Sequence, residues 1–416
     1  MKNIVKKFLS DKKTVCISAC TLFALILFVV IFNLLKPPVI AFYGIEESTK
    51  NSIIKTIDDW NNSINLKYKY KTLDSSKTLE SQAYSVKNCT ILFTVSGAAV
   101  KKASSLAHKK SYISKSPFSE MTSSIRSSAI TNEENTRVIA MPLLSDHFEI
   151  DIDLGAFNRS KLRSIATWND IEKFLSVESK ITKNPLIFAG KDAPTALDLY
   201  GALVEAFDGT AEYLKAVEMI EKNKNESWNP PLLAETLCDD YNSPLYSTVD
   251  NLSKWYQKGL LNKESFNLTK NDVNEFLKAR LASSVFMSLE QHRKVDNATI
   301  ERFSSIYLPS QKSAGERNFT AKIIYAVPQK KNADFTKMIM YLLSTQGQEQ
   351  LSRNTGLAPV LAHCKTPDRQ SDDARYWIAA TNTPLAGLSR EVDLTLEQKQ
   401  DLAKEIGAKI KVKALK

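Results

Sequence analysis

Acidic side chains alternate with apolar ones at 148–154, and they are the first candidates for chemistry in this 416-residue chain. Glu149, Asp151 and Asp153 fall on one side of the predicted strand, because side chains alternate between the two faces of a strand. Carboxylate oxygens in such an array could bind a cation. However, the four histidines are scattered through the chain without the spacing of metal ligands. We therefore interpret the three carboxylates as a solvated face, and we expect no metal and no other cofactor.

Motifs for catalysis or nucleotide binding are absent from the sequence. It has no Walker loop, no dinucleotide fingerprint, no zinc-ligand cluster and no Gly-x-Ser-x-Gly nucleophile elbow. Glycine accounts for only 12 of the 416 residues, which disfavours loops that cradle phosphates. Two acids distant in the chain could still serve a glycoside hydrolase. The sequence therefore favours a binding protein over an enzyme, with an envelope hydrolase as a lesser alternative.

The elements that would position a binding site are clearest in the segment 306–360. Residues 322–327 have the pattern of a buried strand that stops at Pro328. Apolar residues then recur at helical spacing behind Asp334, which can cap that helix. A shorter helix at 346–354 ends before Gly356, where a left-handed C-cap costs glycine little. Earlier in the chain, strands alternate with helices from Val39 onward, which predicts a largely parallel sheet covered on both faces.

This order of elements resembles the extracellular solute-binding proteins, the receptors of ABC importers related to maltose-binding protein. The residues that carry the resemblance are Asn332-Ala333-Asp334-Phe335, Leu342-Leu343, Gln350-Leu351, Gly356 and Pro359-Val360. Phe157 and the run Thr167-Trp168-Asn169-Asp170-Ile171 match a further block of the family. The block at 276–287 also matches, although Ala279 replaces the usual glycine, and the family's Gly-x-Trp is missing at 288–292.

The resemblance implies a type II periplasmic-binding-protein fold of the α/β class, with two lobes joined by hinge segments. The predicted parts are a cytoplasmic N-terminus (1–13), a transmembrane anchor (14–35), a first lobe (39–148 and 310–353) and a second lobe (149–309 and 354–416). In such a receptor the lobes close on a ligand that contacts both of them.

The resemblance and the rule that ligands bind at the carboxyl ends of strands together predict a ligand site in the cleft. Aromatic faces would cover sugar rings, and polar side chains would bind the hydroxyls. The predicted ligand-binding residues are Tyr43, Ser96, Gly97, Asp153, Phe188, Asp192, Glu290, Gln291 and Trp377, with Asp153 at the hinge. For Trp377, core packing is an equally good interpretation.

The run 14–35 has no charged side chain and is long enough to span a bilayer, which needs about 20 residues. Five lysines precede it, so the positive-inside rule places the N-terminus in the cytoplasm. We expect an uncleaved single-pass anchor in a bacterial cytoplasmic membrane, with the rest of the chain in the periplasm or outside the cell. Ile17-Ser18-Ala19-Cys20 has the form of a lipoprotein processing box, but most of the apolar run follows the cysteine. The exported cysteines Cys89, Cys238 and Cys364 are interpreted as buried thiols.

The predicted function is the capture of a small solute, a sugar or oligosaccharide, for an ABC importer. The expected partners are that solute, the permease subunits and the membrane. The net charge of +10 is concentrated at the chain ends, so no nucleic-acid partner is expected. The departures from the family at Ala279 and 288–292 leave an alternative open, in which the fold is kept as a tethered scaffold or interaction module without a ligand.

Overall fold

The computed structural model describes residues 23, 37–109, 111–311 and 320–416. Except for Phe23, the predicted cytoplasmic segment 1–13 and membrane anchor 14–35 lie outside these residues, as does Cys20. Within the described part of the chain, no helix combines the length and the apolar character needed to cross a membrane. Cys89, Cys238 and Cys364 are buried free thiols, as predicted.

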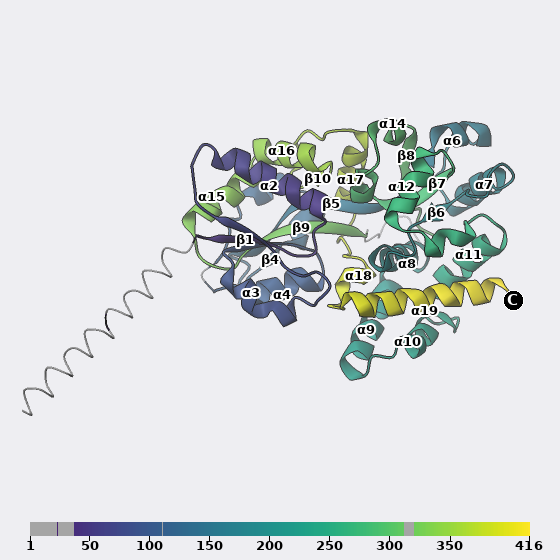
Figure 1. Cartoon of the computed structure of the whole chain (residues 1–416), viewed down its shortest axis with the longest axis horizontal. Coiled ribbons are helices and arrows are strands. Elements are labelled where there is room, and N and C mark those ends of the chain that lie inside the picture. The colour runs from purple at the N-terminus through teal and green to yellow at the C-terminus, as the bar shows by residue number, and fades with distance from the viewer. Residues whose placement is uncertain (1–22, 24–36, 110, 312–319) are drawn as a thin grey trace, which may run out of the picture.

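The protein has a mixed α/β fold, as the sequence predicts (Figure 1). Its strands are β1 (Val39–Phe42), β2 (Lys69–Thr72), β3 (Ile91–Val95), β4 (Ile130–Thr131), β5 (Val138–Asp153), β6 (Ile187–Phe188), β7 (Ser284–Ser288), β8 (Phe303–Ile306), β9 (Ala321–Pro328) and β10 (Ala358–Pro359). Its helices in the first part of the chain are α2 (Glu47–Asn61), α3 (Ala83–Asn88), α4 (Ala98–Leu106), α5 (Ser123–Ser128), α6 (Leu154–Ser160), α7 (Trp168–Glu178), α8 (Ala193–Asp208), α9 (Thr210–Glu226) and α10 (Pro230–Cys238). The later helices are α11 (Tyr246–Gln257), α12 (Lys270–Lys278), α13 (Leu289–His292), α14 (Asn297–Ile300), α15 (Ala333–Leu342), α16 (Thr345–Thr355), α17 (Arg369–Ala379), α18 (Leu388–Glu391) and α19 (Leu396–Ala414).

The strands follow the order β2-β1-β3-β9-β5-β7-β6. β1 lies between β2 and β3 and is parallel to both, whereas β9 is antiparallel to β3 and β5. The prediction of a largely parallel sheet is therefore wrong, because β9 and β5 run against the strands beside them, and β5 is also antiparallel to β7 and β8. β5 is long enough to pair with strands at both ends of this array. Its residues 141–147 pair with β9, and its residues 148–152 pair with β7. One continuous strand therefore joins two halves of the molecule.

Two large apolar cores form among the described residues, with a smaller third cluster beside the second core. We call the body around the first core, which includes β1, β3 and β9, the first lobe. The body around the other two clusters, which includes α8, α11 and α19, is the second lobe. β5 passes from Leu144 in the first core to Phe148 in the second, and the three residues between them are polar and buried. Figure 1 shows the two lobes side by side, with β5 between them.

The segment between Leu357 and Ile378 packs in the first core, although the predicted boundaries assign it to the second lobe. The reason is that β10 pairs with Leu144 and Ser145 of β5, which holds the following α17 against the first lobe. The chain rejoins the second core at Leu385. The other predicted lobe boundaries stay predictions.

Helix α15 begins at a different cap from the one expected. Asn332, rather than Asp334, is the N-cap, and its side-chain Oδ1 accepts hydrogen bonds from the backbone N–H groups of Asp334 and Phe335, at 3.0 and 3.2 Å. Asp334 lies within the first turn and forms an exposed ion pair with Lys337. The end of α16 is as predicted, because Gly356 is its C-cap with a φ of 72°. Both asparagine and aspartate favour N-caps, so residue type alone does not separate the two candidates.

Replacing Asn332 with alanine is expected to lower the free energy of unfolding by about 1 kcal/mol, because two N–H groups at the start of α15 lose their acceptor. Chemical denaturation would measure the loss. Asp334→Ala is the matched control and should cost less, since it removes one exposed ion pair. An equal or larger loss in the control would mean that the cap is assigned to the wrong residue.

Candidate functional site

A cavity of about 350 Å³ lies between the two lobes. The first lobe contributes the end of β1 at Tyr43 and the start of α4. The second lobe contributes the first turn of α8, including Thr195, and the starts of α12 and α19. Asp146 of β5 and Lys322 of β9 line it where these two strands pair. Both lobes and the strand that joins them therefore shape one cavity.

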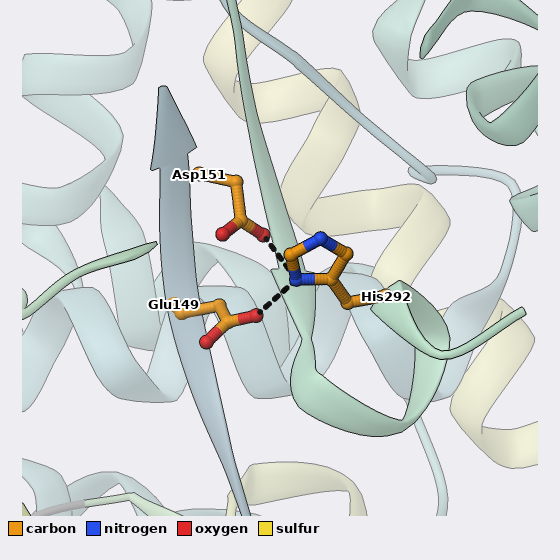
Figure 2. Close-up of side chains that lie close together, drawn as sticks. All are labelled: Glu149, Asp151 and His292. Carbon is orange, nitrogen blue, oxygen red and sulfur yellow. Dashed lines mark hydrogen bonds and ion pairs between the residues drawn. The ribbon is translucent and has the colours of Figure 1, made fainter. Parts of the chain in front are cut away.

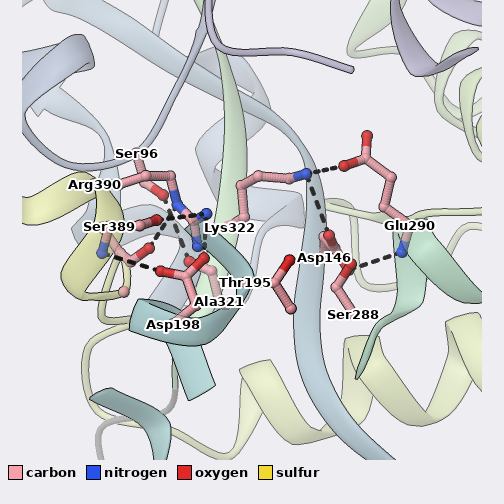
Figure 3. A network of polar contacts seen from close by, with 12 residues as sticks. Ser96, Asp146, Thr195, Asp198, Ser288, Glu290, Ala321, Lys322, Ser389 and Arg390 are labelled. Carbon is pink, nitrogen blue, oxygen red and sulfur yellow. Dashed lines mark hydrogen bonds and ion pairs between the residues drawn. The ribbon is translucent and has the colours of Figure 1, made fainter. Parts of the chain in front are cut away.

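Lys322 is the centre of a buried ionic network in this cavity (Figure 3). Its Nζ lies 3.3 Å from Asp146 Oδ2 and also pairs with Glu290. The Asp146 and Glu290 side chains are only 2% and 3% exposed, and the Glu290 backbone N–H donates to Asp146 at 3.1 Å. Thr49 of α2 donates a further hydrogen bond to Glu290. This network connects α2 of the first lobe, both central strands and α13.

Burial and ion pairing act in opposite directions on this network. Burial lowers the pKa of Lys322, but the Glu290 and Asp146 carboxylates raise it by more. The pKa therefore lies above the usual value for lysine, and the amine stays charged. Burial raises the pKa of Glu290, yet the Lys322 ammonium lowers it by more. For Asp146 burial outweighs the pairing and the pKa is raised. In keeping with this, Lys322 lies closer to the Glu290 carboxylate than to that of Asp146.

A second ionic group lines the cavity on the side of α8. Arg390 Nη1 lies 2.6 Å from Asp198 Oδ2, and the Ser389 backbone N–H donates to the same carboxylate at 3.2 Å (Figure 3). Arg390 also donates to the Ala386 carbonyl at 2.7 Å. These contacts hold α18 against α8 and orient it towards the first lobe.

The lobes also touch directly at the edge of the cavity. Glu46 of the first lobe forms ion pairs with Lys270 at the start of α12, at 2.9 Å, and with Lys294. The Leu396 backbone N–H at the start of α19 donates to the Ser76 carbonyl at 3.1 Å. The two lobes are therefore in contact on both sides of the cavity, as in a closed form.

Five of the predicted site residues lie at or beside this cavity. Tyr43 and Glu290 line it. Ser96 accepts a hydrogen bond from the Ile323 backbone N–H at 3.1 Å, and a Cβ at Gly97 would lie 2.2 Å from the Arg390 carbonyl oxygen. Asp192 caps α8 and lies 3.4 Å from the lining residue Lys270.

The other four predicted residues lie elsewhere. Asp153 ends β5 and caps α6 by accepting from the Ala156 N–H at 2.9 Å, and its predicted place at the hinge stays a prediction. Phe188 is fully buried against Phe266. Gln291 is buried within α13 and does not line the cavity. Trp377 is half-buried and packs against the rings of His147, which lines the cavity, and Tyr307, so both predicted alternatives for it stay open.

Sequence reasoning missed most of the charged lining, above all Lys322, Asp198 and Arg390. One signal was available, because Lys322 stands at the start of a strand that is otherwise apolar. A charge there is either exposed or paired, and the sequence does not show its partners. Asp198 lies within the buried helix α8, where a carboxylate needs a cationic partner.

The interpretation of the acidic strand as a solvated face is wrong. Glu149 and Asp151 are 0% and 1% exposed, because β7 and β8 flank this part of β5 and the distant helices α13 and α17 pack against the strand. His292 comes from α13 and lies against both carboxylates (Figure 2). His147, two residues before Glu149, also contacts it. Two of the four histidines, His147 and His292, therefore meet these acids in space.

Comparison with known proteins yields matches in structure but not in sequence. No protein-family model matches the chain, and no curated protein matches it. The bacterial solute receptor AcbH, described as exclusive for β-D-galactopyranose, matches with a TM-score of 0.64 at 12% identity, over 91% of this chain and 99% of that one. The solute-binding protein RafE in complex with raffinose matches with a TM-score of 0.64 at 13% identity, over 90% and 99% of the two chains.

A chitin oligosaccharide binding protein matches with a TM-score of 0.62 at 12% identity, over 89% of this chain and 99% of that chain. RafE from Streptococcus pneumoniae matches in its apo form as well, with a TM-score of 0.61 at 12% identity over 91% and 99% of the two chains. The fold of this protein is therefore that of the solute-binding receptors, and the resemblance inferred from its motifs is confirmed at the level of the fold.

Proposed function

We propose that this protein captures a small neutral sugar or oligosaccharide outside the cytoplasm and delivers it to an ABC importer. The observation that carries the proposal is the cavity of about 350 Å³ between two lobes of a solute-receptor fold. This volume is at the small end of the range for ligand pockets, roughly 300–1,000 Å³. A ligand of one or two sugar rings fits it best. Binding requires no reacting group, in keeping with a receptor rather than an enzyme.

The charges in the lining support a neutral, hydroxyl-rich ligand. Among the described residues, the carboxylates of the lining are Glu46, Asp146, Asp198, Glu290 and Asp393. The cationic side chains of the lining are Lys270, Lys322, Arg390 and Lys399. Acids and bases nearly balance and are largely paired with one another, so the cavity has no strong preference for an anion or a cation. Paired charges still accept and donate hydrogen bonds, which sugar hydroxyls require.

Neutral mono- and disaccharides are expected to raise the melting temperature of the purified chain. A ligand that binds only the folded state stabilises it by about 2.7 kcal/mol at a hundredfold excess over Kd.

Asp393→Asn, in the lining, should weaken sugar binding about tenfold or more, because hydrogen bonds to charged groups contribute about 1.5–3 kcal/mol. Asp401→Asn, outside the lining, is the matched control and should leave the affinity unchanged. Equal affinities in the two variants would place the site elsewhere.

A tethered scaffold without a ligand is the second candidate function. It is favoured by the ion pairs of Glu46 with Lys270 and Lys294, in which the protein's own side chains connect the lobes. The absence of Gly-x-Trp at 288–292 also favours the scaffold. If no sugar or other small solute shifts the melting temperature, the scaffold is the better function.

We also propose that the uncharged run 14–35 anchors the protein in a bacterial cytoplasmic membrane, with residues from 36 onward outside the cytoplasm. The length of the run and the five lysines before it support this arrangement. The tether would hold the cavity close to the permease subunits of the importer. Membrane fractionation with protease treatment of intact cells would test the topology, and a protein released by a high-salt wash would contradict it.

A further inference from the structure

Two carboxylates and two imidazoles meet inside the protein, close to the point where β5 enters the second lobe. We call Glu149, Asp151, His292 and His147 the β5 cluster. His292 Nδ1 lies 3.1 Å from Glu149 Oε1 and 3.4 Å from Asp151 Oδ2 (Figure 2). His147 Nε2 lies 3.1 Å from the second oxygen of Glu149. All four side chains are at most 3% exposed.

The spacing of the donor atoms is that of a metal coordination sphere. One donor atom each from Glu149, Asp151 and His292 lies within 4.8 Å of the other two. Nitrogen and oxygen ligands bind zinc at about 2.0–2.1 Å, so two ligands at a tetrahedral angle are about 3.3–3.4 Å apart. The separations of 3.1 and 3.4 Å from His292 agree with this value. The ligands also come from two elements, β5 and α13, that a bound ion would tie together.

The inner oxygens of the two carboxylates face the imidazoles of the cluster. Glu149 Oε2 lies 3.1 Å from His147 Nε2, and Asp151 Oδ2 lies 3.4 Å from His292 Nδ1. The other oxygen of Asp151 accepts from Ser305 Oγ at 2.8 Å, which turns Oδ2 towards His292. Two buried carboxylates on the same face of one strand repel each other, and a divalent cation would neutralise both. In metal sites, the atom of a metal-binding side chain that does not bind the metal is commonly held by a hydrogen bond.

A hollow lies near the cluster. A hollow of about 450 Å³ lies beside β8 and α17, and Ser305 and Asp373 are among the residues that line it. Ser305 is the residue that holds Asp151, so the hollow reaches the side chain next to the cluster. Asp373 would attract a cation into the hollow. The cluster itself does not open into the hollow, because its four side chains are at most 3% exposed and Ser305 lies between.

We propose that the β5 cluster is a structural binding site for a divalent first-row transition metal, with zinc as the expected ion. Glu149, Asp151 and His292 are the ligands, and His147 orients Glu149. An imidazole nitrogen combined with carboxylates suits zinc better than calcium or magnesium, which prefer oxygen ligands alone. The ion would tie β5 to α13, whose neighbouring residue Glu290 belongs to the ionic network of the cavity. His147 of the cluster also lines the cavity between the lobes, but none of the three proposed ligands does, so zinc binding does not depend on the proposed sugar contacts.

The purified full-length chain, stripped with a chelator and titrated with zinc, is expected to bind one equivalent per chain in competition with a chromophoric chelator. Cobalt should give the visible absorption of a low-symmetry site with nitrogen and oxygen ligands. His292→Ala should abolish both signals, and Glu149→Gln, which keeps the shape of the side chain, should weaken zinc binding at least a hundredfold. His363→Ala is the matched control, because His363 is half exposed and contacts Thr345 and Glu120 far from the cluster.

Absence of zinc and cobalt binding by the wild-type chain would overturn the proposal, and the cluster would then be a network of hydrogen bonds and ion pairs. Unchanged zinc binding in a folded Glu149→Gln variant would overturn it as well. If His292→Ala does not fold, the wild-type zinc titration, the cobalt spectrum and the Glu149→Gln variant still show whether the cluster binds a metal. Zinc uptake is measured without sugar, so its failure and the failure of the proposed receptor function are separate results.

Discussion

Replacing Lys322 with methionine is expected to lower the free energy of unfolding by about 3–5 kcal/mol, because it breaks a buried ion pair by removing one partner. The side chain is 11% exposed and is the cation for two carboxylates, Asp146 and Glu290, that are almost fully buried. Methionine is similar in volume, so the loss is mainly electrostatic. Without the ammonium group, two negative charges would remain close together in a region with little water. Urea denaturation of the purified chain measures the change.

Lys337→Met is the matched control for this experiment. Lys337 pairs with Asp334 at 3.6 Å on the surface, with side chains 72% and 48% exposed, and such pairs contribute less than about 1 kcal/mol. The triple variant Asp146→Asn, Glu290→Gln, Lys322→Met should regain much of the lost stability, because it leaves no unpaired charge. If Lys322→Met costs no more than Lys337→Met, the network is not the buried ionic centre described above.

Gly97→Ala is expected to weaken sugar binding at least tenfold by keeping the lobes apart. Gly97 has a φ of 93°, and a Cβ there would lie 2.2 Å from the Arg390 carbonyl oxygen of the second lobe. The lobes would have to separate to relieve this contact, and a ligand that binds the closed form would then have to supply the free energy of closure. Calorimetric titration with the best sugar from the thermal screen measures the affinity, and small-angle scattering measures the separation.

Gly209→Ala provides a control with the same kind of backbone strain. Gly209 has a φ of 90°, but a Cβ at this position would meet no atom of the described residues within 4 Å. Backbone strain of this kind costs about 1–3 kcal/mol and should lower the stability of both variants. Only Gly97→Ala should also enlarge the protein in solution and reduce sugar affinity. Equal behaviour of the two variants would show that Gly97 does not control closure.

Local structure was the part of the fold that the sequence predicted best. The apolar periods at 322–327 and 335–343 correspond to β9 and α15, and Gly356 caps α16 in the left-handed conformation. These features depend on neighbours within a few residues, where side-chain spacing and backbone preference act directly. The motifs were also sufficient to identify the receptor fold, although no sequence comparison finds a relative. Two predicted residues, Tyr43 and Glu290, line the cavity.

The sequence by itself therefore determined many of the strands and helices, the class of fold and the presence of an uncharged run that could anchor the chain. Only the tertiary structure decided which charges are buried and which groups they meet. Glu290 is 144 residues from Asp146, yet its N–H bonds to that carboxylate, and His292 is 143 residues from Glu149. Periodicity reports how a segment alternates between polar and apolar residues, but not what covers it. A polar face on a strand is solvated or buried according to its distant neighbours, because the cost of burying a charge depends on whether a partner is present.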